Sequence, residues 1–309
     1  MNGSPANPPE TERNRLKEVC QARPILEELS PPAVIRSIEE NPCELFRYIS
    51  AGWPRMEVHD DPEMLWSISD IPFPLFNSVL RTRLAPDVAE QAIATAIARC
   101  RSRGVPLLWW TWPSTRPQNL GSLLKARGFT EEDFPGMAID LRKLSESRAA
   151  LARLRIELVD DPRKRKNWSH ILRVGFELPE IVEEAFSDCA ALDFTRRGSL
   201  YNHIGWMEGQ PLATSTLFLG AGVAGIYNVT TIPEARRKGI GSAMTLAALN
   251  EARTLGYRVG IIHSTPIASN VYRKLGFKEY CKISQYVWTA DSRQEEEERI
   301  REVQASEFA

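Results

Sequence analysis

EARRKGIGSAMTLAALNEARTLG, residues 234–256, contains three consecutive cations, two glycines one residue apart and an apolar run at helical spacing. A helix that begins at these glycines presents unpaired backbone N–H groups and the positive end of its dipole. Because Gly239 and Gly241 lack a Cβ atom, an anion can approach those amides closely. We therefore predict an anion-binding loop, and a pyrophosphate suits its glycines and its cluster of positive charge best.

Two common phosphate-binding motifs do not match this loop. A Walker A loop requires the pattern GxxxxGK[ST], which is absent here. A dinucleotide-binding GxGxxG loop requires a third glycine where Met244 stands, and it normally follows the first strand of a parallel sheet. Several segments that resemble antiparallel strands precede residue 234 instead, so neither motif explains the loop.

The elements on both sides of the loop indicate an α/β fold. Upstream, LYNHIGWME, LATSTLFLG and AGIYNVTTI predict three successive strands, joined by tight turns at residues 208–211 and 220–222. Downstream, a helix over residues 239–256 is followed by the strand RVGIIHS and by the helix SNVYRKLGF, which closes at Gly276.

A similar order of elements occurs earlier, as helix 87–104, strand 106–112 and helix 120–128. Aligning the closing glycines gives offsets of 152 residues (256 − 104) and 148 residues (276 − 128). We interpret the halves as diverged tandem copies of one unit of class α/β (α+β), each with a mixed, mostly antiparallel sheet flanked by helices. We predict a partly disordered segment over residues 1–30, the two copies over residues 31–147 and 148–291, and a charged tail over residues 292–309.

The composition excludes several classes of protein. With a formal net charge of −1 over 309 residues, the chain is not a basic protein that coats nucleic acid. Its five cysteines are scattered without a CxxC pair, which argues against a metal site and favours a reducing compartment. Neither a signal peptide nor a membrane-spanning apolar run is visible. We expect a cytoplasmic protein without a metal, nucleic-acid or membrane partner.

Two motifs stand on either side of the strand RVGIIHS. The first is RxxGxG at residues 236–241, and the second is VYRKLGF at residues 271–277, which contains Tyr-x-x-x-Gly-Phe. In their order and spacing they resemble the pyrophosphate loop and the late helix of the GNAT superfamily of acyl-CoA-dependent N-acyltransferases. The resemblance covers residues 153–289 well, and it implies the fold of that family with acetyl-CoA as the acyl donor.

The resemblance also implies which residues bind acetyl-CoA. The pantetheine arm pairs with the backbone of the strand before the loop, where an N–H group polarises the thioester carbonyl, and the pyrophosphate lies over the glycines. The implied cofactor-binding residues are Val229, Thr230, Thr231, Arg236, Arg237, Lys238, Gly239, Ile240, Gly241 and Ser242.

The first copy lacks these features. Its segment that aligns with the glycine loop is LAPDVA, residues 84–89, which has no glycine and no cation and contains an aspartate that repels phosphate. Leu124 stands where the second copy has Tyr272. We therefore expect the first copy to have lost cofactor binding and chemistry, so that each chain binds one acetyl-CoA.

Tyr272 is the candidate general acid. The resemblance implies that an amine attacks the thioester directly and that Tyr272 protonates the leaving thiolate. A phenol suits this role because its reference pKa of about 10 keeps it protonated at neutral pH. The alternative is that Tyr272 only packs its helix against the sheet.

The sequence does not single out a general base. Many members of the family have a carboxylate on the strand before the loop, but AGIYNVTTI has none. Asn228 could orient a water molecule or the amine, and His263 titrates in a useful range, although a buried histidine is commonly structural. Glu180, Glu183 and Glu184 are further candidates, and their alternative role is to form a solvated helix face.

These observations predict an acetyl-CoA-dependent N-acetyltransferase that acts on a small-molecule or peptide amine, and a homodimer is compatible with the sequence. The alternative is a non-catalytic acyl-CoA sensor or interaction protein that keeps the loop without turnover. The missing strand carboxylate favours the sensor, whereas Tyr272 beside an intact loop favours the enzyme.

Overall fold

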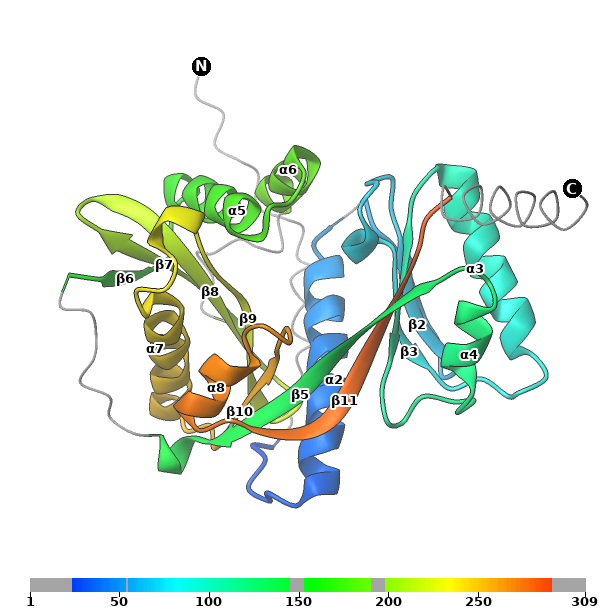
Figure 1. Cartoon of the computed structure of the whole chain (residues 1–309), viewed down its shortest axis with the longest axis horizontal. Helices are drawn as coiled ribbons and strands as arrows, with labels where there is room; N and C mark the ends of the chain where they lie inside the picture. Colours follow the sequence, from blue (N-terminus) through cyan, green and yellow to red (C-terminus); the bar gives the residue numbers. More distant parts are fainter. Residues whose placement is uncertain (1–23, 54, 145–152, 190–197, 291–309) are drawn as a thin grey trace, which may run out of the picture. The chain divides into compact units, whose positions relative to one another are not determined.

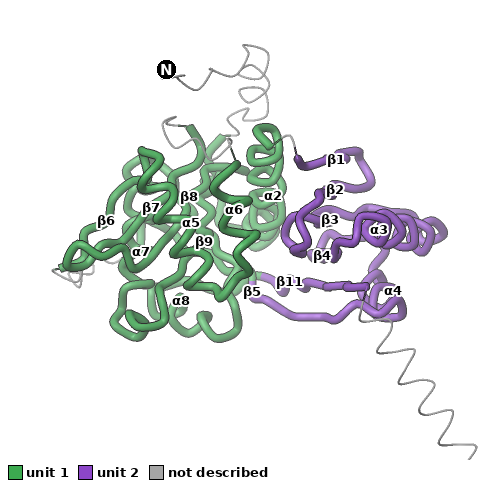
Figure 2. Tube along the Cα trace, turned by 90° about the horizontal axis from the view of Figure 1, so that it is seen from above, with its two compact units in different colours: residues 1–54, 136–280 green, residues 55–135, 281–309 purple. Residues whose placement is uncertain are grey.

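The computed structural model describes residues 24–53, 55–144, 153–189 and 198–290 (Figure 1). The charged tail lies outside these ranges, as does most of the segment 1–30. The chain forms two compact units: unit 1 comprises residues 1–54 and 136–280, and unit 2 comprises residues 55–135 and 281–309 (Figure 2). No helix in the described part of the chain is both long and apolar enough to cross a membrane.

Unit 1 is built on a mixed sheet. Neighbouring strands run antiparallel except β9 and β10, which run parallel. In order across the sheet, the strands are β5 (Thr130–Asp140), β10 (Val259–His263), β9 (Val223–Thr231), β8 (Gln210–Gly220), β7 (Leu200–Met207) and β6 (Arg155–Leu158). Both residues of each hairpin turn, Glu208–Gly209 and Ala221–Gly222, have positive φ, so the predicted turns are confirmed.

Helices cover both faces of this sheet. α2 (Pro31–Ser50) and α5 (Pro162–Phe176) lie on one face, with α6 (Glu180–Asp188) packed on α5; α7 (Ile240–Thr254) and α8 (Ser269–Leu275) lie on the other. Alternating strand side chains distinguish the faces. Thr230 faces α5, since a Cβ atom on Gly175 would stand 2.4 Å from its Oγ1. Ser215 Oγ faces α7 instead and lies 3.4 Å from Met244 O.

Hydrogen bonds attach α2 to the strands of unit 1. Asn41 Nδ2 donates to Gly220 O over 2.7 Å, and Tyr227 Oη donates to Asn41 Oδ1 over 2.6 Å. Gly225 makes room for this contact, because a Cβ atom there would lie 2.1 Å from Asn41 Oδ1. The compact units therefore differ from the predicted ranges 31–147 and 148–291, which separate α2 from the strands on which it packs.

Unit 2 has its own mixed sheet and core. Its strands are β1 (Glu57–Asp60), β2 (Met64–Ile68), β3 (Ser78–Thr82), β4 (Leu107–Thr111) and the end of β11 (Lys278–Trp288). β3 and β4 run parallel, with α3 (Ala89–Arg103) between them in sequence, and α4 (Leu120–Lys125) follows β4. Trp109 and Trp288 are fully buried in the core of this unit. A mixed, mostly antiparallel sheet flanked by helices is thus confirmed for both units.

The two long strands, β5 and β11, each have residues in both units. Residues 136–140 of β5 belong to unit 1, where they pair with residues 259–263 of β10. Residues 284–288 of β11 belong to unit 2, where they pair with residues 107–111 of β4. Neither sheet is therefore made from one continuous stretch of sequence.

The same order of elements recurs along the chain. β3, α3, β4, α4 and β5 are matched by β9, α7, β10, α8 and β11. The closing glycines used to align the halves, Gly104, Gly128, Gly256 and Gly276, all have positive φ, which favours glycine over other residues. The interpretation of the halves as diverged copies remains a prediction.

Candidate functional site

The glycine loop lies in unit 1 between β9 and α7, as predicted. After β9 ends at Thr231, one short 3₁₀ turn leads to Gly239, which precedes the first helical residue, Ile240. Gly239 and Arg237 have φ values of 78° and 63°. These left-handed conformations bend the chain sharply at the point where the N–H groups of α7 begin.

The first turn of α7 borders open space. A Cβ atom on Gly239 would meet no atom within 4 Å. A Cβ atom on Gly241 would have as nearest neighbours Thr231 Oγ1 at 3.9 Å and Val229 Cγ1 at 4.0 Å. The glycines thus leave room above the helix N-terminus, beside the end of β9, which is the geometry that an anion needs to reach the backbone amides.

The three cations of the loop are not equivalent. Arg236 Nη2 donates to Gly175 O over 2.8 Å and lies 3.4 Å from Glu177 Oε1, while its Nε donates to Thr231 O over 3.2 Å. Arg236 therefore joins the C-terminal end of α5 to the end of β9. Arg237, by contrast, forms no hydrogen bond or ion pair with any described residue.

Lys238 is held within the loop. Its Nζ donates to Glu234 O over 3.2 Å and keeps further N–H groups for another acceptor. The three cations thus differ in their contacts: Arg236 is engaged at several sites, Lys238 at one, and Arg237 at none among the described residues.

β9 contains a bulge immediately before its end. Thr214 pairs with Thr230 but Thr216 pairs with Tyr227, so the register shifts by one residue at Asn228, whose φ is 51°. The parallel pairing of β9 with β10 extends only from Ala224 to Ile226. The two strands thus separate where the bulge begins, and the last residues of β9 lie beside the gap.

A chain of hydrogen bonds orients the side chain of Asn228. Asn228 Nδ2 donates to Thr216 Oγ1 over 3.1 Å, and Thr216 Oγ1 donates to Asn202 Oδ1 over 2.5 Å. Because a hydroxyl has one proton, the Thr216 proton given to Asn202 makes Thr216 an acceptor from Asn228. The amide oxygen of Asn228 forms no hydrogen bond with any described residue, and the residue is half-buried.

Thr216 and Asn202 were not predicted from the sequence. Both are at least 98% buried, and Asn202 Nδ2 has no hydrogen-bond partner among the described residues. Their signal in the sequence is the hydroxyl run Thr-Ser-Thr at 214–216 in an otherwise apolar strand. Buried polar groups of this kind require a partner, and the partner can only be identified from the fold.

His263 lies on the same face of the sheet as Asn228, under α2. Its Nε2 is 3.2 Å from Ile38 O, and its ring packs edge-on against Tyr227 with centroids 5.9 Å apart. A carbonyl oxygen only accepts, so the proton is on Nε2 and the lone pair is on Nδ1. Burial lowers the pKa of His263 to about 4, which keeps the ring neutral.

Tyr272 lies on the opposite side, where α8 packs in the same core cluster as Ile226 and residues of α7. The residue is 7% exposed, and its ring packs against Phe277 with centroids 5.8 Å apart. Burial raises the pKa of Tyr272 to about 12. Its hydroxyl forms no hydrogen bond with any described residue, so the phenol is protonated and has its proton available.

Glu180, Glu183 and Glu184 line a groove of about 390 Å³ between α5 and α6. Glu183 Oε2 lies 2.5 Å from Arg173 Nε and 3.3 Å from His170 Nδ1. Glu183 therefore forms ion pairs that stabilise the contact between α5 and α6. Among the described residues, no contact directs its carboxylate toward Asn228.

The equivalent loop in unit 2 has different geometry. α3 starts at Ala89 with Val88 as its N-terminal cap, and Asp87 is exposed beside it. None of residues 84–89 is a glycine or a cation. This helix N-terminus has the carboxylate of Asp87 where the α7 loop has Gly239 (239 − 87 = 152), so it repels phosphate.

Comparisons with known proteins agree with this arrangement. Residues 166–277 match the model of the acetyltransferase (GNAT) family. No curated protein sequence matches the chain. A GCN5-related N-acetyltransferase from Kribbella flavida is 16% identical with a TM-score of 0.64, over 82% of this chain and 95% of that chain.

Two further solved structures share the fold. A GCN5-related N-acetyltransferase from Sphaerobacter thermophilus is 12% identical with a TM-score of 0.55, over 84% of this chain and 93% of that chain. A tandem GNAT protein from the clavulanic acid biosynthesis pathway is 13% identical with a TM-score of 0.54, over 86% and 96%. Residues 166–277, which match the model of the acetyltransferase (GNAT) family, include β9, the glycine loop, α7, β10 and α8.

Proposed function

We propose that unit 1 is an acetyl-CoA-dependent N-acetyltransferase, in which an amine attacks the thioester directly. The observation that carries the proposal is the room above Gly239 and Gly241 at the start of α7, next to the point where β9 separates from β10. An anion fits this room because the backbone N–H groups of the first turn of α7 border it, and nearby Arg237 forms no ion pair with any described residue. Acetyl-CoA, when bound, supplies an activated acyl group at the gap between the strands.

The residues that would hold acetyl-CoA fall into two groups. The end of β9 would contribute backbone groups of Val229, Thr230 and Thr231. The side chains of Val229 and Thr231 lie on the α7 side of the sheet, whereas that of Thr230 faces α5. Gly239, Ile240, Gly241 and Ser242 would offer N–H groups to the pyrophosphate, with Arg237 and Lys238 supplying charge. Arg236 would shape the loop through its bonds to α5 and β9.

Asn228 and Tyr272 would act from opposite faces of the sheet. The amide oxygen of Asn228, which has no partner among the described residues, would accept a hydrogen bond from the attacking amine and so fix its position. Tyr272 would donate the proton of its hydroxyl to the leaving sulfur. In direct transfer, the attacking amine and the leaving sulfur occupy different positions around the acyl carbon. Residues on opposite faces of the sheet suit this arrangement, because each can act on one of the two groups.

His263 is too weak a base to deprotonate an ammonium ion. Its pKa of about 4 is far below the value of about 10 that is typical of an alkylammonium group. We therefore propose that the amine loses its proton to solvent before it binds, and that His263 positions α2 and Tyr227. This assignment needs no carboxylate on β9.

The reaction would take place in the cytoplasm, with a small-molecule or peptide amine as acceptor. No disulfide joins the described cysteines, Cys43, Cys100, Cys189 and Cys281. Burial raises the pKa of Cys100 to about 12, so that thiol is inert as a nucleophile. Cysteines that form no disulfide with one another support a reducing compartment.

Replacing Tyr272 by phenylalanine tests the proposal. Tyr272→Phe should lower kcat by roughly 10²-fold, the scale of general-acid catalysis, and should leave the Kd for acetyl-CoA unchanged because packing against Phe277 is kept. The measurements are thiol release over a panel of amines and calorimetric titration with acetyl-CoA. Tyr280→Phe on β11 is the matched control and should leave both values unchanged.

The rival function is an acyl-CoA sensor without turnover. It predicts saturable acetyl-CoA binding but no thiol release with polyamines, amino acids, aminosugars or peptides. Binding without turnover over the whole panel would favour the sensor, and full activity of Tyr272→Phe would remove Tyr272 from the mechanism.

A further inference from the structure

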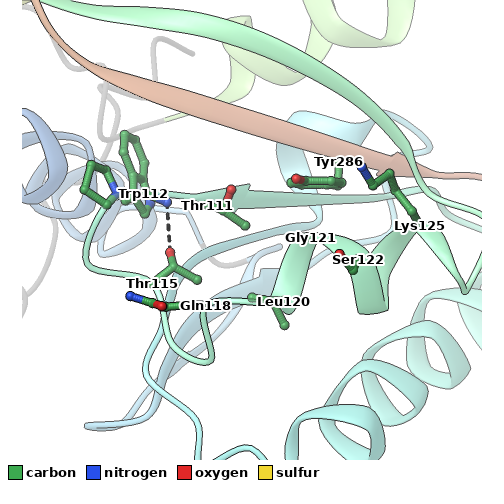
Figure 3. Close-up of a pocket in the computed structure, with 10 residues that line it drawn as sticks. Thr111, Trp112, Thr115, Gln118, Leu120, Gly121, Ser122, Lys125 and Tyr286 are labelled. Carbon is green, nitrogen blue, oxygen red and sulfur yellow. Dashed lines mark hydrogen bonds between the residues drawn. The ribbon is translucent and has the colours of Figure 1, made fainter.

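Unit 2 contains a cavity of about 420 Å³ between the end of β4, the start of α4 and Tyr286 of β11 (Figure 3). This size lies within the range of small-molecule sites. The cavity is separate from the glycine loop, because all of its lining residues belong to unit 2.

One wall of the cavity is a phenol held in a fixed position. Tyr286 Oη donates to Glu131 Oε1 over 2.6 Å, and Lys125 Nζ donates to Glu131 Oε2 over 2.9 Å. Gly121 makes room for the ring, since a Cβ atom on Gly121 would stand 2.3 Å from Tyr286 Oη. Figure 3 shows Tyr286 and Lys125 next to each other at one end of the cavity.

The cavity has no net charge to offer an ion. The ammonium group of Lys125 is already paired with Glu131. Hydrogen bonds from Tyr286 and Lys125 lower the pKa of Glu131, so its carboxylate stays charged and cancels the lysine at neutral pH. An ionic ligand would therefore bring a charge that nothing in the cavity balances.

The remaining polar groups are neutral and uncommitted. The Gln118 amide and the Ser122 hydroxyl form no hydrogen bond with any described residue. Thr115 Oγ1 accepts from the backbone N–H of Trp112 over 2.8 Å, which leaves its own proton to be donated. Lys125 also keeps two N–H groups. The cavity thus presents both donors and acceptors, as hydroxyl groups of a ligand require.

The opposite end of the cavity is apolar. Trp112 and Pro113 line it, and Figure 3 shows Trp112 on the side away from Lys125. The indole N–H of Trp112 donates to Leu80 O over 2.6 Å, so the ring presents carbon atoms to the cavity. An aromatic wall next to hydroxyl and amide groups suits the C–H and O–H groups of a saturated ring.

We propose that this cavity binds a neutral, hydroxyl-rich ring, that is, a sugar or a cyclic polyol. The inference does not depend on the acetyltransferase activity of unit 1. It gives unit 2, whose loop lacks phosphate-binding features, a ligand site of its own.

Ligand-observed NMR with probes of one size and different charge tests the proposal. The neutral probes are the methyl glycosides of glucose, galactose and mannose, together with myo-inositol; glucosamine and glucuronate are their cationic and anionic counterparts at pH 7. At least one neutral probe should show saturable binding, at least about 10-fold tighter than both charged probes, since an unbalanced buried charge is unfavourable. No saturable binding by any neutral probe, or tighter binding of a charged one, would overturn the proposal.

Two variants show whether the ligand occupies this cavity. Gln118→Ala and Ser122→Ala each remove one uncommitted group from an exposed position, so the fold should be kept, and each should raise the Kd of the bound probe about 3- to 10-fold. Gln91→Ala on the exposed face of α3 is the matched control and should leave the Kd unchanged. Wild-type affinity in both cavity variants, with unchanged thermal unfolding, would place the ligand elsewhere and contradict the assignment.

Discussion

Asn228 has a left-handed backbone conformation and a side chain that is oriented by a hydrogen bond. Its φ of 51° is a conformation that asparagine tolerates far better than the β-branched residues that follow it in β9. Its backbone oxygen accepts from Thr214 Oγ1 over 2.7 Å, and its Nδ2 donates to Thr216. Both threonines therefore hold the bulge, and the orientation of one amide depends on residues of the neighbouring strand.

Thr216→Val should test this dependence at the level of a single residue. Valine keeps the shape but cannot accept from Asn228 or donate to Asn202, so kcat/KM for the amine should fall about 3- to 10-fold with an unchanged KM for acetyl-CoA. Combining Thr216→Val with Asn228→Ala should cost little more than Asn228→Ala alone. Ser215→Ala, whose side chain points to the other face, serves as the control; additive losses in the double variant would separate Thr216 from Asn228.

His263 makes a prediction about stability and pH. Burial lowers its pKa in the folded protein to about 4, below the value of about 6.5 in an unfolded chain. Between these values the unfolded chain binds the proton more readily, so the free energy of unfolding should fall as the pH drops from 6.5 to 4. Urea unfolding at pH 4.5 and 6.5 measures the difference. His263→Gln should reduce it.

At the scale of elements, α7 and the end of β9 form the site together. Hydrophobic periodicity and closing glycines were sufficient to predict α3, α7, α8 and the strands β7, β8 and β9, because those signals are local. The engagement of Arg236 was not predictable, since its partner Gly175 lies 61 residues earlier and is recognised only once α5 packs on β9. Similarly, no local signal places α2 on the strands of unit 1.

Gly241→Ala should move stability and binding in opposite directions. The added methyl group meets no atom closer than 3.9 Å, and alanine favours a helix over glycine, so the melting temperature without ligand should stay constant or rise slightly. The same methyl group occupies the room above the helix N-terminus, so acetyl-CoA affinity should fall at least about 10-fold. Differential scanning fluorimetry and calorimetry give the two values. Wild-type affinity would show that the pyrophosphate does not bind there.

At the scale of the whole molecule, the two units divide the sequence into interleaved segments. α2 and residues 136–140 complete unit 1, although both precede the stretch 148–291 that the sequence predicts to be the second copy. Sequence patterns show where an element begins and ends but not which partner it pairs with, and pairing across more than 100 residues has no local signal. This is why the predicted fold class was right while the compact units differ from the predicted ranges.

A fragment of residues 148–291 should therefore not fold stably alone. Without residues 136–140, β10 becomes an edge strand, and without α2 the side chains of Tyr227 and His263 lose their hydrogen-bond partners. Far-UV circular dichroism and urea titration should show a weak or absent cooperative transition for the fragment and a clear one for residues 24–290. Equal midpoints for the two chains would mean that α2 and β5 contribute nothing to unit 1.

The strands β5 and β11, which have residues in both units, also affect how the protein folds during synthesis on the ribosome. β10 pairs with a segment of β5 made more than 100 residues earlier, and β4 waits for residues 284–288. The first half cannot be finished before the second is translated, because β5 lacks β10, and β4 lacks β11, until those strands have been made. We expect rare-codon pauses between residues 140 and 259 to prolong this exposure, and chaperones that bind unpaired strands to matter most in that interval.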